Sequence, residues 1–191
     1  MASPPLMPIA DALARITGAL QPLAPESVSV ARGYGRVLAE NVVARVTQPP
    51  AAVSAMDGYA VRAADVAKVP TNLRVIGEAP AGSAFEGRFG PGDAVRIFTG
   101  APVPDGADAI VMQENTRREG STVAVTEGAE AGRHIRPAGL DFSTGDIRLA
   151  KGRMLTARDI GLAAAMNVPW LMVNRKPRIA LLATGDEIVK P

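Results

Sequence analysis

A chain of 191 residues with a hydrophobic content of 47% can build one good-sized domain or two small ones, with a core mostly of aliphatic side chains because only 4% of its residues are aromatic. The formal net charge of +2 comes from scattered basic residues, which, with so few aromatic side chains, argues against nucleic-acid binding. The absence of cysteine excludes disulfides, thiolate metal sites and a cysteine nucleophile, and no apolar run approaches the roughly 20 residues that cross a bilayer. The first residues do not follow the pattern of a signal peptide, and we expect a soluble cytoplasmic protein.

The first predicted element is a helix that begins near Pro8 and ends before Pro22. Its apolar residues recur at helical spacing and share one face: Ile9, Leu13, Ile16 and Leu20. A second, short helix is predicted over residues 34–39, followed by an extended stretch through Val46. The sequence Gln48-Pro49-Pro50 then interrupts the pattern and indicates a domain boundary.

Residues 47–136 have the pattern of a small β-rich unit. Short runs rich in β-forming residues occur at 73–76, 94–98, 109–112 and 122–125, separated by turns that contain Gly, Pro and Asp-Gly. We therefore predict little helix in this segment.

A helix is predicted to begin after Thr156, which is a good N-cap with Asp159 as its capping-box partner, and to end at Asn167. An extended stretch follows over residues 169–173, and the apolar run 178–183 has the pattern of a buried strand of a parallel sheet. Because a parallel strand needs a crossover connection to reach its partner, we expect the natural protein to continue and this chain to be a fragment.

Three loop segments carry candidate functional residues, and each also has a structural interpretation. Asp57 in the segment 54–62 precedes a glycine, so it serves either a turn or a site. Thr99 follows an apolar run in the segment 96–104, where the loop either presents its hydroxyl or is a stiff connector. Asp141 in the segment 139–145 is either a ligand or a carboxylate that stabilises a turn.

A fourth segment, Thr184-Gly185-Asp186-Glu187, follows the last apolar run. In open α/β sheets, ligands bind beyond the carboxyl ends of the strands, and two adjacent carboxylates there suit Mg²⁺; the alternative is the N-cap of a following helix. The single histidine, His134, has no partner histidine or cysteine in the sequence and is interpreted as structural. Taken one by one, these residues do not specify a reaction.

Taken together, four segments resemble one family, the molybdopterin molybdenumtransferases. The resemblance is carried by residues 54–60, 99–108, 111–114 and 184–187, which occur in the family's order and at about its spacing. It covers almost the whole chain, but only about the first half of a typical member of the family.

The resemblance implies an α+β, multidomain fold. Residues 1–46 and 137–176 would form a discontinuous, helical and extended first domain that dimerises, and residues 47–136 an inserted β-rich domain. Residues 177–191 would begin a third, α/β domain that binds molybdopterin and is mostly absent from this chain.

The resemblance also implies a reaction, in which molybdate is inserted into adenylylated molybdopterin with Mg²⁺-dependent release of AMP. Asp57, Thr99, Asp141 and Glu187 match catalytic positions; Thr184, Gly185 and Asp186 match cofactor-binding positions; Asp186 and Glu187 would hold the metal ion. Members of the family are homodimers whose cleft lies between subunits, and partners would include a protein that supplies adenylyl-molybdopterin and the molybdoenzymes that receive the product.

Two departures limit what the resemblance implies. Residues 51–53 are Ala-Ala-Val where many members carry Asp and Asn, and Leu140 stands where many have Glu, so one carboxylate is missing beside Asp141. Because most of the third domain is absent, we predict that the fragment alone is inactive.

Two other functions remain open. A scaffold could keep this architecture without its chemistry, as gephyrin, a relative that anchors receptors, illustrates; the acidic residues retained here favour an enzyme. A β domain that binds sugars or peptides is the third alternative, against which the scarcity of aromatic residues argues.

Overall fold

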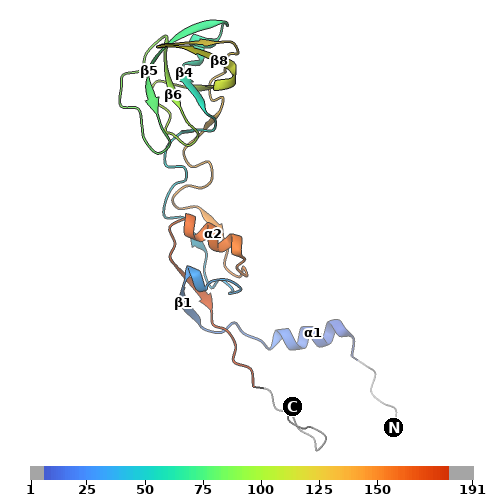
Figure 1. The fold of residues 1–191 in the computed structure, drawn as a ribbon. Helices are drawn as coiled ribbons and strands as arrows, with labels where there is room; N and C mark the ends of the chain where they lie inside the picture. The colour runs from blue at the N-terminus through green and yellow to red at the C-terminus, as the bar shows by residue number, and fades with distance from the viewer. Residues whose placement is uncertain (1–6, 181–191) are drawn as a thin grey trace, which may run out of the picture. The chain divides into compact units, whose positions relative to one another are not determined.

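The computed structural model describes residues 7–180, which divide into two compact units. One unit is the continuous segment Ala44–Asp146. The other is discontinuous and is built from the two flanking segments, one ending at Val43 and the other beginning at Ile147. Both contain helix and strand, with few helices (Figure 1). No helix among residues 7–180 has the length and apolarity to cross a membrane.

The discontinuous unit is held together by strands from its two segments. Strand β1 (Pro25–Ser29) pairs antiparallel with β12 (Trp170–Asn174), as the blue and red arrows of Figure 1 show, and β2 (Val42–Val43) pairs antiparallel with β11 (Ile147–Leu149). A 3-10 turn, η1 (Val30–Arg32), follows β1. The unit's core holds Leu38, Leu155, Ala163, Met166, Leu171 and Val173, which are almost completely buried.

The two helices of this unit begin where the sequence predicts, but the first ends at Gly18, before Leu20, which the prediction placed on its apolar face. Helix α1 (Ile9–Gly18) starts after Pro8, and none of its residues is buried. Helix α2 (Ala157–Ala165) has the predicted capping box: the Thr156 hydroxyl accepts from the Asp159 N–H, and the Asp159 carboxylate accepts from the Thr156 N–H at 2.9 Å. Asn167 follows with a positive φ of 59°, which ends the helical geometry.

The predicted helix over residues 34–39 is wrong. Val37 forms an isolated antiparallel bridge with Met154, and Leu38 forms one with Val173. Leu38 is completely buried in this extended arrangement. Tertiary pairing against β12 therefore outweighs the local helical tendency of this short segment.

The continuous unit is built on a six-stranded sheet in the order β7-β4-β6-β5-β9-β8. Its strands are β4 (Gly58–Val61), β5 (Thr71–Ala79), β6 (Asp93–Ile97), β7 (Ala109–Met112), β8 (Thr116–Glu119) and β9 (Thr122–Val125). The β5–β6 pair is parallel and the other pairs are antiparallel. The 3-10 turns η2 (Ala63–Val66) and η3 (Gln113–Asn115) lie between strands, and β3 (Val53–Ser54) pairs antiparallel with β10 (Ile135–Arg136).

Both faces of the sheet are covered. Tyr59, Val61 and Val111 belong to one buried cluster, whereas Ala60 and Ile110, which alternate with them along β4 and β7, belong to another. Because side chains on both faces of the sheet are buried, these strands have continuous apolar sequences rather than alternating ones. The four predicted runs fall on β5, β6, β7 and β9. They did not include β4 or β8, the latter a polar edge strand whose residues are mostly exposed.

The two units divide at positions that differ from the predicted domain boundaries. Residues 44–46 and 137–146 lie in the continuous unit, because backbone hydrogen bonds join these two parts of the chain. The Gln48 N–H donates to the Phe142 oxygen, the Ala44 N–H donates to the Asp146 oxygen and the Gly145 N–H donates to the Ala44 oxygen, each at 2.9 Å. Residues 178–180 have neither helix nor strand, and the rest of the predicted final strand lies outside the described residues.

Gly58 is needed because β7 approaches it closely. A β-carbon at this position would lie 2.0 Å from the backbone oxygen of Val111, and the contact is with backbone that cannot rotate away. We therefore expect Gly58→Ala to destabilise the protein by about 3 kcal/mol or more, at the upper end of the cost of overpacking a core. Urea unfolding measures this free energy; a loss no larger than that of Gly18→Ala, where a β-carbon meets open space, would contradict it.

Candidate functional site

Three loops meet beyond the ends of strands β4, β6 and β7, at one end of the six-stranded sheet. We call this place the β4 edge, after the strand that begins there. Gly58, the first residue of β4, pairs with Ile97 at the end of β6 and with Met112 at the end of β7. Since both neighbours are antiparallel to β4, the chain entering β4 lies beside the chain leaving β6 and β7. The sequence segments 54–60, 99–108 and 111–114 are therefore brought together here.

Asp57 and Thr99 are joined at this edge by two hydrogen bonds. Asp57 Oδ1 accepts from the Thr99 backbone N–H at 2.8 Å and from the Thr99 hydroxyl at 2.7 Å. The backbone oxygen of Asp57 accepts from the Gln113 N–H at 3.1 Å, which ties the third loop to the same residue. The hydroxyl's donor is thus used, and its oxygen keeps acceptor capacity for a second partner.

The pKa of the Asp57 carboxyl is lowered from its ordinary value of 3.8. The backbone hydrogen bond from Thr99 is the largest cause and the hydroxyl hydrogen bond is the next; partial desolvation opposes them, and the positive charge of Arg96 adds a smaller lowering. Asp57 is therefore a carboxylate at neutral pH, at an edge where three loops converge.

Arg96 is a site residue that the sequence prediction missed. Its guanidinium donates to the Gly58 backbone oxygen at 3.0 Å and to Gln113 Oε1 at 2.6 Å. It also lies 5.3 Å from the centroid of the Tyr59 ring and 4.8 Å from that of Phe98. A lone cation within the buried strand Asp93–Ile97 is the sequence signal that could have identified it.

Ser54 makes hydrogen bonds to both of the loops that carry Asp57 and Thr99. It is 1% exposed, and its hydroxyl donates to the Met56 backbone oxygen at 2.6 Å. Its backbone oxygen accepts from Gly100 at 2.8 Å, and its N–H donates to Ala101 at 2.9 Å. The loops that carry Asp57 and Thr99 are therefore fixed to each other through backbone hydrogen bonds as well as through the two side chains.

Asp141 lies beside β10 in the same unit. Its two carboxylate oxygens accept from one Arg136 nitrogen at 3.1 and 3.2 Å, and its backbone N–H donates to Gln48 at 3.0 Å. Both side chains are 45% exposed. Leu140 beside it is 52% exposed and faces solvent.

The remaining predicted site residues, Thr184, Gly185, Asp186 and Glu187, lie outside the described residues. Within residues 7–180, no group of three or more His, Cys, Asp or Glu side chains is arranged to hold a metal ion. His134 has a positive φ of 57°, and its Nε2 accepts from Arg133 at 3.1 Å.

The lowered pKa of Asp57 predicts a pH dependence of stability. A carboxyl whose pKa is lower in the folded than in the unfolded state stabilises the fold above its unfolded pKa, near 3.8, and loses this contribution as the pH falls through the folded pKa. We expect Asp57→Asn to be less stable than the parent by a constant margin from pH 7 to about pH 5, and this margin to shrink in more acidic solution. Urea unfolding across this range tests it; a margin that stays constant down to about pH 2 would exclude a contribution from the charge.

Comparison with known proteins gives a consistent result. Residues 7–167 match the family described as the MoeA N-terminal region (domain I and II). A molybdopterin molybdenumtransferase of Nostoc sp. is 40% identical over 168 residues, which cover 86% of this chain and 38% of that protein. The Haemophilus influenzae molybdopterin molybdenumtransferase is 35% identical over 170 residues, covering 88% and 42%.

A solved structure agrees with the same family. The molybdopterin biosynthesis moeA protein from Pyrococcus horikoshii OT3 superposes with a TM-score of 0.86 at 34% sequence identity, covering 91% of this chain and 47% of that one. The chain thus spans about two fifths of the length of the curated relatives, at 38% and 42%.

Proposed function

This chain belongs to the family of MoeA N-terminal regions, and from that premise we propose that it is part of a molybdopterin molybdenumtransferase, an enzyme of molybdenum cofactor biosynthesis. The observation that carries the proposal is the Asp57–Thr99 pair at the β4 edge. It joins two of the segments by which the sequence resembles this family, and the backbone of Asp57 binds the third.

The proposed reaction inserts molybdate into adenylylated molybdopterin and releases AMP. Molybdate, the dithiolene sulfurs and the phosphates are all anionic, so the enzyme must hold like charges together while the phosphoanhydride is opened. Mg²⁺, for which the carboxylate oxygens of Asp186 and Glu187 are suitable ligands, would supply positive charge to the phosphates.

The described residues would fix the geometry of the site. In this proposal Asp57 orients Thr99 through Oδ1, and its Oδ2 accepts a hydrogen bond from a water molecule or a substrate hydroxyl. The guanidinium of Arg96 holds the Gly58 and Gln113 loops together and offsets the charge of Asp57. Asp141, fixed by Arg136, would contribute a second carboxylate.

We also propose that the protein works as a homodimer, with the β4 edge facing the third domain of the partner subunit. The exposed apolar face of α1 supports dimerisation: Ile9, Leu13 and Ile16 are 88%, 59% and 63% exposed, and Leu20, just after the helix, is 67% exposed. Such a face is unfavourable in water and is typical of a contact surface. A protein that supplies adenylyl-molybdopterin and recipient molybdoenzymes would be transient partners.

The proposed function is tested by molybdate-dependent release of AMP from adenylylated molybdopterin. We expect a protein extended to the length of its relatives to release AMP only when molybdate and Mg²⁺ are both present, and the 191-residue chain alone to release none. A folded, extended protein that never releases AMP would favour the scaffold alternative.

A further inference from the structure

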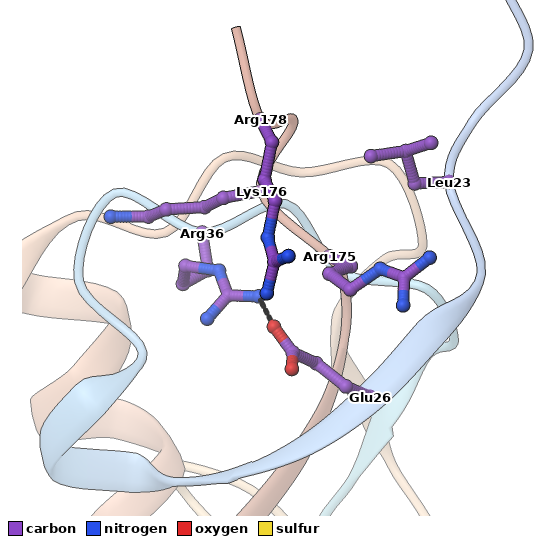
Figure 2. Close-up of a pocket in the computed structure, with 6 residues that line it drawn as sticks. All are labelled: Leu23, Glu26, Arg36, Arg175, Lys176 and Arg178. Carbon is purple, nitrogen blue, oxygen red and sulfur yellow. Dashed lines mark hydrogen bonds and ion pairs between the residues drawn. The ribbon is translucent and has the colours of Figure 1, made fainter.

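A basic pocket lies in the discontinuous unit, and the proposed reaction does not use it. It has a volume of about 550 Å³ and is lined by Leu23, Glu26, Arg36, Arg175, Lys176 and Arg178 (Figure 2). Strand pairing explains why these residues meet. Because β1 and β12 are antiparallel, the chain entering β1 lies beside the chain leaving β12, and the Arg175 N–H donates to the Ala24 backbone oxygen at 3.2 Å.

The pocket has an excess of positive charge. Four of its six lining side chains are cationic, and Glu26 is the one carboxylate among these described residues. Glu26 is already paired with Arg36, which also donates to the Asn174 backbone oxygen at 3.0 Å. Arg178 lines the same pocket, and in the view of Figure 2 its side chain extends toward this pair.

Arg36 is also incompletely satisfied. It is only 9% exposed, and its Nε is a buried nitrogen for which the described residues provide no hydrogen-bond acceptor. A buried guanidinium with an unused donor is costly, and the exposed cations beside it repel it. An anion in the pocket would offset both.

We propose that this pocket is a binding site for a tetrahedral oxyanion, either a phosphate group or molybdate. Guanidinium groups match the oxygens of such anions because each presents several N–H donors in a fixed plane. The guanidinium of Arg36 is held in place by its contacts within the protein. Arg178 supplies a second guanidinium from the exposed segment after β12. Arg175 and Lys176, whose side chains diverge in Figure 2, add positive charge at the rim.

Glu26 competes with the anion in this proposal. Its carboxylate, which is 42% exposed, forms an ion pair with the guanidinium of Arg36 when the pocket holds no oxyanion. Removing this charge should therefore strengthen binding, whereas removing a pocket cation should weaken it. General surface charge would give effects of the same two signs, so the comparison that identifies the pocket is between a pocket cation and a cation of equal charge elsewhere on the surface.

The experiment measures binding of inorganic phosphate and of molybdate to the chain by isothermal titration calorimetry at constant ionic strength. Arg178→Gln is expected to weaken binding about tenfold, the effect of losing one charge-assisted hydrogen bond. Glu26→Gln is expected to strengthen it. The control Arg158→Gln removes the same charge from the exposed surface of α2 and should leave the affinity unchanged.

Each outcome decides the proposal. Tighter binding of phosphate would identify a phosphate-group site, tighter binding of molybdate an oxyanion-substrate site, and both support the shared chemistry. No binding of either anion would overturn the proposal, as would equal losses in Arg178→Gln and Arg158→Gln. Because no turnover is involved, this result is independent of whether the protein releases AMP.

Discussion

Replacing Asp57 by Ala is expected to lower molybdate-dependent AMP release at least about 100-fold in the protein extended to the length of its relatives. The substitution removes the acceptor that holds both the N–H and the hydroxyl of Thr99, so the threonine loses its fixed orientation. It also removes a carboxylate that is ionised at neutral pH and whose pKa the Thr99 hydrogen bonds lower further. Loss of one preorganised polar group at a reaction site typically has an effect of this size.

Two further variants separate orientation from charge. Asp57→Asn keeps an oxygen that can accept from Thr99 but has no charge, whereas Thr99→Val keeps the charge and loses the hydroxyl. Glu119→Ala removes an exposed carboxylate at the end of β8 and is the matched control, for which no change in rate is expected. Wild-type rates from Asp57→Ala would exclude the β4 edge from the reaction.

The double substitution Leu13→Glu with Ile16→Glu is expected to convert the proposed homodimer into monomers. Both residues lie on the exposed apolar face of α1, at 59% and 63% exposure, and none of this helix's residues is buried within the chain. Burying two such side chains in an interface stabilises it by roughly 3 to 6 kcal/mol, so their replacement by charges should raise the dissociation constant at least about 100-fold.

Sedimentation equilibrium measures this dissociation constant directly. The matched control is Ala14→Glu with Arg15→Gln, which makes the same change in charge on the opposite face of the same helix. It should leave the dimer intact, because the apolar face is unchanged, while the change in charge is the same as in the test variant. Equal dissociation constants for the two double variants would contradict a dimer contact through the apolar face.

The sequence predicted best those elements whose signals are local. The capping box of Thr156 and Asp159 is encoded within four residues, and its helix was predicted correctly. Residues 34–39 were predicted wrongly, because the position of Leu38 is decided by its bridge to Val173, far away in the chain. No local pattern contains that information.

The candidate site shows the same limit. Resemblance to a family identified Asp57 and Thr99, and the strand register shows how they meet: Gly58 lies opposite Ile97, two residues before Thr99. Arg96 was missed, because its importance arises from contacts with Tyr59 and Gln113 on other strands and loops. The glycine after Asp57 first suggested a turn, but it is required for the close approach of β7.

The central claim is that the β4 edge forms one half of a reaction site completed by the partner subunit. Mixing two inactive variants of the extended protein, Asp57→Ala and Glu187→Gln, tests it most directly. If the halves come from different subunits, each mixed dimer contains one site with both substitutions and one intact site. Random mixing should then restore AMP release to about a quarter of the wild-type rate, because half the dimers are mixed and each has one of two sites intact. A mixture that stays as inactive as its two components would contradict the claim.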